Sequence, residues 1–409
     1  MTRVALLCWE AGGGLGHGVA LTKVGHALQM RGWRAVLALP GDRTPADLRT
    51  GGLTICPAPR WSDGVSAGPQ KKQSSASLGD VLAQLGLQSA ECVRRQIAGW
   101  HQLFASYSPD LIVADFAPGA VLAARNRVAC VVRGVGFTVP PPGLHRFPRL
   151  HDLAAVLYDE AAILATVNSV LAEIGSQPIA FLPEVLTGDA QCVCTVPLLD
   201  PYASFRLEPV LGPLLSAAVS LRGDDAVDVF CYLHDSPYVS RLDEIADCLR
   251  GLPAPVVAYL PGLAGAVRDR LRRNGVNVLD APAEVARQLV RSRLVVHSGG
   301  HGIAAAALLA GVPQVILSSD IEKLLTAQAL MRRGIAYQLD YARAEVESVR
   351  AGILAALDDP VLEREAIRAA GEHEGYRSRD VVSEIAATCE RAAEGAAGLQ
   401  PVVQENRPQ

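Results

Sequence analysis

Residues 294–302 read Leu294-Val-Val-His297-Ser-Gly299-Gly300-His301-Gly302, and an alanine-rich run then leads to Gly311-Val-Pro313. The apolar residues predict a buried strand, and the paired glycines connect it at once to a helix. Such a turn directs backbone N–H groups and the positive end of the helix dipole at whatever lies above it, which favours a phosphate. The residues expected to hold the phosphate are His297, Gly299, Gly300, His301 and Gly302.

A second turn of the same kind follows the first expected strand, Val4–Cys8. It reads Gly12-Gly-Gly-Leu-Gly16-His17. Its glycines do not match G-x-G-x-x-G, because the last glycine position is taken by His17, so hydride chemistry on a dinucleotide loses its main support. One glycine turn in each half of the chain predicts two α/β domains that face a shared cleft.

Apolar strand-like segments alternate with helical segments along both halves, which predicts parallel sheets with right-handed crossovers. The expected strands are Val4–Cys8, Arg34–Leu39, 109–115, Val128–Val132, Val227–Leu233, Val256–Leu260, Val276–Leu279, Leu294–His297 and Gln314–Leu317. The expected helices include Val19–Met30, 80–107 and 151–172. Because ligands bind at the carboxyl ends of strands in open α/β sheets, His17, Asp115, Ser236 and His297 become candidate site residues.

Segments rich in proline and glycine indicate where the domain boundaries lie. We expect an N-terminal domain over 1–200, a proline-rich linker over 201–226 and a second domain over 227–376. A charged amphipathic helix is expected over 377–394, followed by a disordered tail over 395–409.

The bulk composition indicates a globular protein in the cytoplasm. Lys and Arg number 38 against 42 Asp and Glu, a net charge of −4, and no basic block suggests a nucleic-acid partner. No uninterrupted apolar run is long enough to predict a spanning helix or a signal peptide. The nine scattered cysteines include no CxxC pair, so we expect reduced thiols and neither disulfides nor a zinc site.

Histidine is suited to take a proton from a hydroxyl near neutral pH, particularly when a carboxylate holds its other ring nitrogen. His17 and Asp115 are the candidates for this pair. The alternative is structural: His17 caps its helix, and Asp115 is an ordinary residue at a strand end.

In their order and spacing, several segments resemble the UDP-glycosyltransferase superfamily of GT-B glycosyltransferases, particularly bacterial members that act on small acceptors. The similar segments are Gly14-Leu-Gly16-His17, Pro109–Asp115, Leu198–Tyr202, Leu211-Gly212-Pro213, Ala310–Gln314, Ala327–Leu330 and Gly334. The resemblance covers most of the chain and implies two Rossmann-like parallel-sheet domains. The first would bind the acceptor and the second the nucleotide sugar, with the final helix crossing back to the first.

The resemblance implies an inverting, metal-independent transfer from a nucleotide-diphosphate sugar, a co-substrate, to an acceptor hydroxyl. His17 would be the general base and Asp115 its orienting residue. The donor would be held by Ser236, His297, Gly299, Gly300, His301, Gly302, Glu322 and Lys323. The acceptor, a small or lipidic molecule, would contact Trp61, Phe137 and Phe147.

The chain departs from the family at several donor positions. Gly302 or Ile303 stands where a hydroxyl side chain is usual, and Glu322-Lys323 replaces an acid–glutamine pair. Pro282-Ala283 replaces the Pro-Gln near the nucleotide base. These changes leave open a homologue that binds a nucleotide or a partner protein without turnover. A hydrolysing nucleotide-sugar epimerase is a further alternative, but it needs additional carboxylates that the sequence does not supply.

Overall fold

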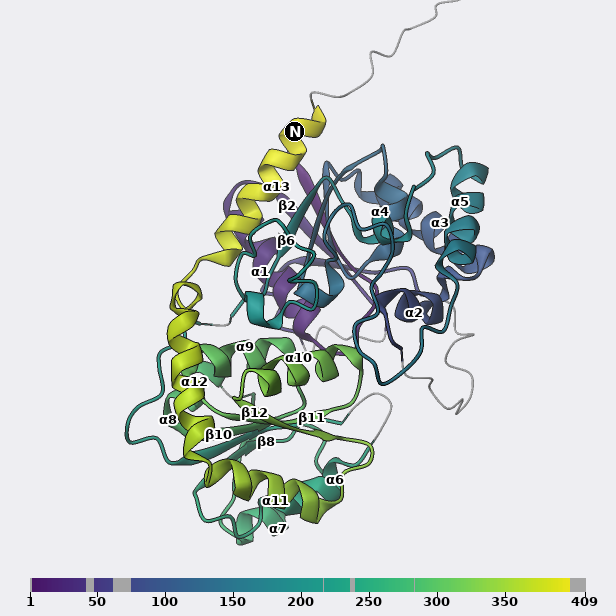
Figure 1. Ribbon diagram of the computed structural model, residues 1–409. Helices are drawn as coiled ribbons and strands as arrows, with labels where there is room; N and C mark the ends of the chain where they lie inside the picture. The colour runs from purple at the N-terminus through teal and green to yellow at the C-terminus, as the bar shows by residue number, and fades with distance from the viewer. Residues whose placement is uncertain are drawn as a thin grey trace, which may run out of the picture.

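The computed structural model describes residues 2–41, 48–61, 75–215, 217–235, 240–282 and 284–397. Two parallel sheets of six strands each form separate domains, the N-terminal one above the C-terminal one in Figure 1. The strand orders are β3-β2-β1-β4-β5-β6 and β12-β11-β10-β7-β8-β9. Both orders therefore reverse beside the first strand of their domain, between β1 and β4 and between β7 and β10. The predicted pair of Rossmann-like sheets, the GT-B architecture, is confirmed.

The strands of the N-terminal domain are β1 (Val4–Trp9), β2 (Arg34–Leu39), β3 (Thr54–Pro57), β4 (Leu111–Asp115), β5 (Ala129–Gly134) and β6 (Ala190–Val193). Its helices are α1 (Gly16–Met30), α2 (Leu78–Leu82), α3 (Ala90–Tyr107), α4 (Pro118–Ala124) and α5 (Glu160–Glu173). One apolar layer packs α1 against the sheet, and a larger layer on the other face holds the residues of α2 to α5.

The strands of the C-terminal domain are β7 (Asp228–Tyr232), β8 (Val256–Tyr259), β9 (Asn277–Val278), β10 (Ser292–His297), β11 (Gln314–Ser318) and β12 (Ala336–Asp340). Its helices are α6 (Leu242–Ile245), α7 (Gly265–Arg273), α8 (Val285–Arg291), α9 (His301–Ala310), α10 (Ile321–Arg332), α11 (Val346–Leu357) and α12 (Pro360–Glu372). Helices α9 and α10 lie on the side that meets the N-terminal domain (Figure 1). Leu325 of α10 is buried in the core of that domain, so the two domains share apolar contacts.

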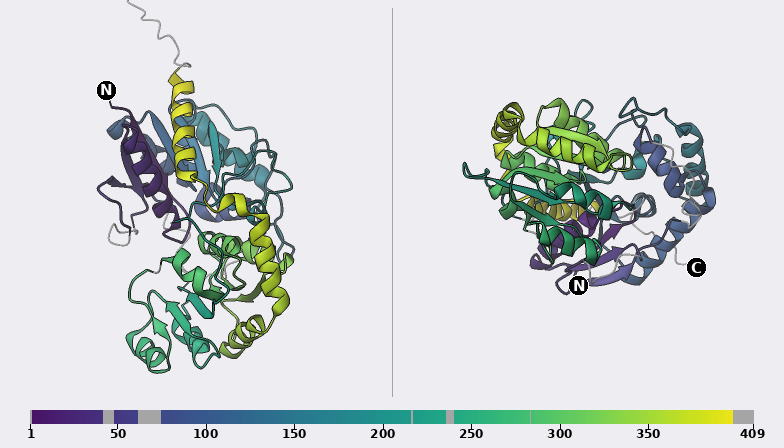
Figure 2. Two further views of the ribbon diagram at one scale, coloured as in Figure 1. Left: turned by 90° about the vertical axis from the view of Figure 1, so that its left-hand side faces the viewer. Right: turned by 90° about the horizontal axis from the view of Figure 1, so that it is seen from below.

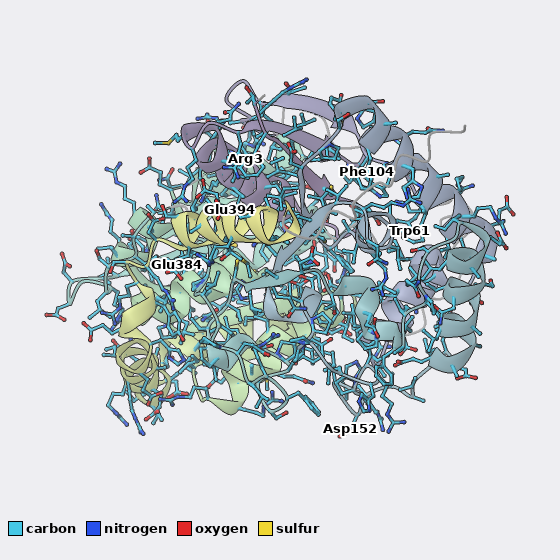
Figure 3. The ribbon with its side chains drawn as sticks, turned by 90° about the horizontal axis from the view of Figure 1, so that it is seen from above. Arg3, Trp61, Phe104, Asp152, Glu384 and Glu394 are labelled. Atoms are coloured by element: carbon cyan, nitrogen blue, oxygen red, sulfur yellow. The ribbon has the colours of Figure 1, made fainter. Side chains whose placement is uncertain are left out.

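The last helix, α13 (Val381–Ala397), lies against the N-terminal domain although α12 belongs to the C-terminal one (Figures 1 and 2). Ile385, Ala386 and Cys389 are fully buried in the apolar layer that also contains residues of α1. Figure 3 shows the helix from above, with Glu384 and Glu394 on it. It begins four residues later than the expected 377 and continues to Ala397; residues 398–409 lie outside the described ranges.

Three short strands, β3, β6 and β12, were not expected from the sequence. All three are edge strands, and their short runs are broken by polar residues or proline, so they lack the long apolar signature of central strands. The helix expected over 151–172 begins only at Glu160, because Asp159 caps it by accepting from the Ala161 N–H. None of the helices in the described part of the chain is long and apolar enough to span a bilayer.

Candidate active site

The carboxyl ends of β1 and β4, where the strand order reverses, carry the first candidate pair. His17 is the second residue of α1, and Asp115 is the last residue of β4. The register pairs Trp9 of β1 directly with Asp115, and the Trp9 indole stacks on the His17 imidazole with ring centroids 5.5 Å apart. Gly12, at φ 103°, provides the left-handed backbone conformation between β1 and α1.

The structure brings His17 and Asp115 together. The Nδ1–H of His17 donates to Oδ1 of Asp115 at 2.9 Å, and the two side chains are 16% and 0% exposed. Nε2 of His17 has no hydrogen-bond partner within the described ranges. A carboxylate acceptor fixes the hydrogen on Nδ1, so Nε2 carries the lone pair that could receive a proton.

Arg133, the penultimate residue of β5, completes this cluster. The sequence alone had not identified it as a site residue. The register pairs Asp115 directly with Arg133, and Nη1 of the arginine donates to Oδ2 of the aspartate in a short ion pair. The signal that could have revealed it is a single cation at the end of an otherwise apolar strand, next to the strand that ends in Asp115.

The three groups shift one another's proton affinities. Burial raises the pKa of Asp115, but Arg133 and His17 outweigh that effect and hold it below its ordinary value. Burial lowers the pKa of His17, whereas Asp115 and, from α10, Glu322 raise it above the ordinary histidine value; Arg133 opposes that rise. The carboxylate is therefore ionised, and the imidazole is a stronger base than an ordinary histidine side chain.

The second candidate site, the turn after β10, is formed differently from the expectation. His297 is fully buried; its Nδ1 accepts from the Gly299 N–H at 3.0 Å, and its Nε2–H donates to Oε1 of Gln314 at 2.8 Å. Burial lowers its pKa to about 4, so the ring is neutral. Because both ring nitrogens are engaged within the protein, His297 has no side-chain N–H left to bind a phosphate. The expected phosphate contact of this side chain is therefore replaced by a structural role, in which the ring fixes the conformation of the turn.

The glycines of this turn border open space. Gly299, at φ 84°, makes the bend, and a side chain at Gly300 or Gly302 would meet no atom within 4 Å. Because the first N–H groups of α9 have no carbonyl partner within the helix, they are free to face an anion there.

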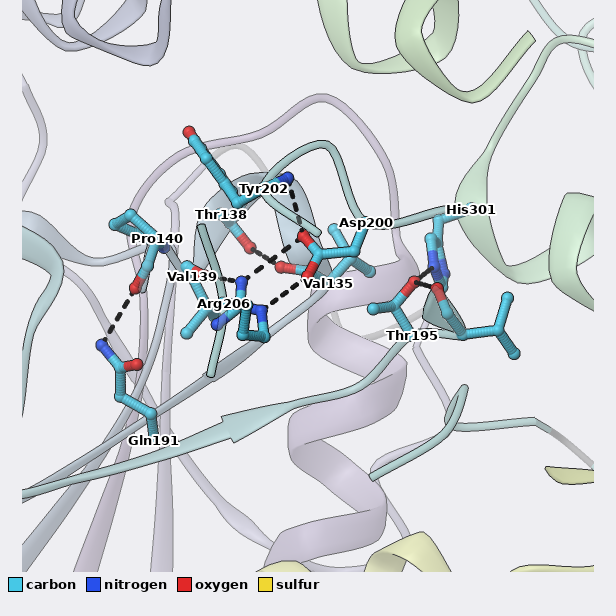
Figure 4. Close-up of polar contacts among 11 residues, drawn as sticks. Val135, Thr138, Val139, Pro140, Gln191, Thr195, Asp200, Tyr202, Arg206 and His301 are labelled. Carbon is cyan, nitrogen blue, oxygen red and sulfur yellow. Dashed lines mark hydrogen bonds and ion pairs between the residues drawn. The ribbon is translucent and has the colours of Figure 1, made fainter. Parts of the chain in front are cut away.

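His301, the first residue of α9, connects the two domains. Thr195, which follows β6, donates its hydroxyl to the Val196 carbonyl oxygen at 3.2 Å and accepts the Nε2–H of His301 at 2.7 Å (Figure 4). Burial and the nearby Arg133 lower the pKa of His301 to about 4, so this ring is also neutral. Because Thr195 engages its Nε2–H, the donor that His301 can offer to an anion above the turn is its backbone N–H.

The first turn of α10, which follows the acidic residue Asp320, places Glu322 in the cleft. Burial and the neighbouring Asp320 raise the pKa of Glu322 to about 7, while His17 and Lys323 oppose the rise. Lys323 is tied to its own turn, because its Nζ lies 3.0 Å from Asp320 Oδ2 and donates to Ser319 Oγ at 3.0 Å. Of the two side chains expected to read the sugar, Glu322 lines the cleft and interacts electrostatically with His17, whereas Lys323 is engaged within its own turn.

A pocket of ≈ 370 Å³ lies between the domains, beside this cluster. It is lined by Val135, Phe137 and Leu150 of the N-terminal domain, by residues 197–201 between β6 and the linker, and by residues of α9 and α10 that include His301, Glu322 and Leu325. Figure 4 shows the linker wall, where Asp200 accepts hydrogen bonds from Arg206 and the Tyr202 N–H. The lining is mixed: apolar side chains such as Phe137, Leu150 and Leu325 alternate with polar ones, which are Asp200, Ser204, His301, Glu322, Thr326 and Arg332.

Of the three aromatic residues expected at the acceptor, only Phe137 lines this pocket. Phe147 belongs to the core behind α2 and does not line the pocket, whereas Phe137, which is part of the same core, does. The Trp61 indole donates to Glu10 at 2.7 Å and packs against the same core. Both residues were expected to overhang the cleft, but apolar burial and a buried carboxylate draw them inward.

Ser236 lies outside the described residues, so its expected donor contact remains a prediction. Across the ranges that the structure describes, no group of three or more His, Cys, Asp or Glu side chains is arranged to hold a metal ion.

Comparisons with known proteins agree with this architecture. Residues 276–391 match the family described as "Erythromycin biosynthesis protein CIII-like, C-terminal domain". A curated relative from Acidiphilium cryptum (strain JF-5) is 27% identical over 367 residues, which cover 86% of this chain and 88% of the relative. It is named UDP-N-acetylglucosamine--N-acetylmuramyl-(pentapeptide) pyrophosphoryl-undecaprenol N-acetylglucosamine transferase.

Solved structures show the same fold. The calicheamicin glycosyltransferase CalG4 superposes with a TM-score of 0.69 at 17% identity, covering 96% of this chain and 98% of that one. The glycosyltransferase SsfS6 of Streptomyces sp. SF2575, complexed with thymidine diphosphate, gives a TM-score of 0.63 at 19% identity and covers 96% of this chain and 100% of that one.

Proposed function

Because this chain is a glycosyltransferase homologue with the GT-B fold, we propose that it transfers a sugar from a nucleotide-diphosphate sugar to an acceptor hydroxyl. The transfer inverts the anomeric carbon and uses no metal ion. The observation that carries the proposal is the His17–Asp115 pair, which lies at the strand-order reversal of the N-terminal sheet. The charge of Glu322, which belongs to the other domain, raises the pKa of His17.

His17 acts as the general base. Nε2 accepts the proton of the acceptor hydroxyl as that oxygen attacks the anomeric carbon from the face opposite the diphosphate. The bond from the anomeric carbon to the phosphate oxygen breaks, and its electron pair leaves with the diphosphate. Asp115 stabilises the imidazolium that forms, because its ionised carboxylate already accepts the Nδ1–H.

The start of α9 holds the leaving diphosphate. Backbone N–H groups of His301, Gly302 and Ile303 supply hydrogen bonds, and the helix dipole supplies a fixed partial positive charge. The open space beside Gly300 and Gly302 supports this placement, since a side chain there would occupy the position of the phosphates. The His297 side chain keeps the turn in shape and does not contact the donor.

Glu322 is placed to contact the sugar, because it lines the pocket and lies close enough to His17 to raise its pKa. The apolar lining around Phe137 and Leu150 suits a small hydrophobic acceptor whose hydroxyl reaches Nε2. The named relatives use or bind different nucleotides, uridine diphosphate sugar in one case and thymidine diphosphate in the other, and the choice here is left to experiment.

The test combines binding with turnover. Thermal unfolding of the purified protein is followed with UDP, dTDP, GDP and ADP, since a ligand of the folded state raises the midpoint with its concentration. The preferred nucleotide sugar is then assayed for transfer to small hydroxylated acceptors with the wild type and with His17→Ala. We expect the variant to bind the nucleotide as the wild type does and to lose transfer.

The competing function is nucleotide binding without turnover. The Lys323 ammonium, tied to Asp320 and Ser319 and unable to copy an amide, is the observation that favours it. A nucleotide-dependent shift in the midpoint without transfer from any sugar of that nucleotide would establish this alternative and contradict our proposal.

A further inference from the structure

Arg133 is the one member of the buried cluster for which the proposed reaction has no role. The two oxygens of Asp115 are divided between two cations: Oδ1 accepts from His17 and Oδ2 from Arg133. The arginine side chain is 5% exposed and Asp115 fully buried, so solvent does not screen the pair. Both residues lie on the same face of the sheet, because β4 and β5 pair them directly.

The pair stabilises the fold poorly for its position. Nε of Arg133 is buried and has no hydrogen-bond partner within the described residues. A buried ion pair also repays its desolvation only with good geometry, and apolar replacements of such pairs are often neutral or stabilising. The other β5 residues from Ala129 to Val132 are apolar and buried, so packing of the strand does not itself call for a cation at this position; loss of Arg133 alone would leave the Asp115 charge without this partner.

We propose that Arg133 is a positioning residue for the base: it fixes the Asp115 carboxylate for His17 and offsets its charge, so that His17 holds its own proton less tightly than it would beside an uncompensated carboxylate. This inference rests on the proposed role of His17. Without Arg133, the imidazole would face an uncompensated buried carboxylate and would hold its own proton more tightly, which makes it a poorer acceptor before each reaction.

The surrounding charges are few and can be named. His17 is influenced by Asp115 of β4, Glu322 of α10 and Arg133 of β5. Arg133 in turn has Asp115 and the Cys194 thiol beside it, and its charge acts on Lys23 of α1 and His301 of α9. Both Asp115 and Glu322 raise the pKa of His17, and Arg133 is the cation that limits this rise.

The experiment follows the titration of His17 by NMR in the full-length protein with isotope-labelled histidine, the resonance being assigned with His17→Gln. Arg133→Met should move the His17 midpoint to higher pH by about one unit, the usual effect of one charge at this range. Arg133→Lys should leave the His17 midpoint close to its wild-type value, because it keeps the positive charge. The Arg133→Met/Asp115→Asn double variant should place the midpoint below that of Arg133→Met.

Arg206→Met is the matched control. Arg206 is also a buried arginine paired with an aspartate, Asp200, but it does not act on His17. An unchanged His17 midpoint in folded Arg133→Met would overturn the inference, as would an equal shift in Arg206→Met. If Arg133→Met does not fold, a His17 midpoint in Arg133→Lys that is raised by about one unit, although the cation is retained, would overturn it as well.

Activity separates this inference from the proposed function. Where transfer is detected, the acid limb of the kcat/KM profile of Arg133→Met should move with the NMR midpoint, and activity near neutral pH should fall up to about tenfold. A shifted midpoint in a protein without transfer would uphold the electrostatic role of Arg133 and contradict the proposed function. Detectable transfer together with an unshifted His17 midpoint in Arg133→Met would uphold the proposed function and contradict the electrostatic role of Arg133.

Discussion

The imidazole of His17 occupies the space that a side chain at Gly12 would need. A Cβ atom added to Gly12 would overlap Nε2 of His17 and lie 2.9 Å from its Cδ2. The absence of a side chain at Gly12 thus keeps open the ring edge that carries the proposed proton-accepting nitrogen.

Gly12→Ala should therefore impair transfer more than donor binding. The methyl group displaces the imidazole, and the positive φ of 103° adds strain of about 1–2 kcal/mol. We expect kcat/KM to fall at least tenfold while the thermal shift by the nucleotide is retained. Gly16→Ala, where the added Cβ meets no atom within 4 Å, is the matched control and should behave as the wild type. Equal effects of the two substitutions would disprove this reading.

Asp115→Asn should reduce kcat by about 10²–10⁴-fold, because the amide removes the charge that stabilises the imidazolium and no longer fixes the ring tautomer. Single-turnover measurement separates this chemical step from product release. His145→Ala, at an exposed histidine stacked on Phe181, serves as the control and should leave the rate unchanged. A normal single-turnover rate in Asp115→Asn would remove Asp115 from the mechanism.

The buried carboxyl of Glu322 should make stability depend on pH. Its pKa is raised from 4.5 to about 7 in the folded protein, so the folded state holds this proton more tightly than the unfolded state does. The contribution of Glu322 to the free energy of unfolding therefore falls as pH rises from 4.5 to about 7, and then levels off.

Urea unfolding of wild type and Glu322→Gln at pH 5 and pH 8 tests this expectation. The stability difference between the two proteins should shift in favour of the variant at the higher pH by about 1–3 kcal/mol. Glu10, another buried carboxyl with a raised pKa, is present in both proteins and cancels in the difference. The exposed Glu394→Gln should show no such shift; a pH-independent difference for Glu322→Gln would contradict the burial argument.

Thr195→Val should weaken the contact between the domains. It removes the hydroxyl that accepts from His301, and the buried imidazole N–H is left unpaired at a cost of about 1–3 kcal/mol. Thr22→Val is the matched control, because the buried Thr22 hydroxyl has no partner within the described residues, and its loss should be neutral or stabilising. Thermal unfolding of both variants decides the matter; equal midpoints would show that the bond contributes nothing.

The sequence allowed the fold and the His17–Asp115 pair to be predicted, but not the role of Arg133 beside them, for a physical reason. Central parallel strands are buried on both faces, so their apolar runs and the glycine turns after them are visible in the sequence. Asp115 could be found because it ends such a run. Arg133 could not be assigned as its partner, since that requires knowing that β4 and β5 are neighbours in register.

The donor turn shows the opposite limit. Its backbone was expected correctly, but the direction of the His297 ring depends on Gln314, a residue 17 positions away on the adjacent strand. Trp61 and Phe147 were likewise misassigned, because a lone aromatic residue carries no sign of which side of a loop it will occupy. Backbone turns are encoded locally, whereas side-chain directions are decided by partners that only the tertiary structure supplies.

The return of α13 to the N-terminal domain has a mechanical consequence. The polypeptide passes between the domains twice, once through the linker after β6 and once between α12 and α13. A body tethered at one point can swivel in any direction, but one tethered at two points turns most easily about the line that joins them. Rigid-body opening should accordingly resemble the movement of a jaw, in which α9 and α10 separate from β1 and β4 along one arc and come back into the same alignment when it shuts.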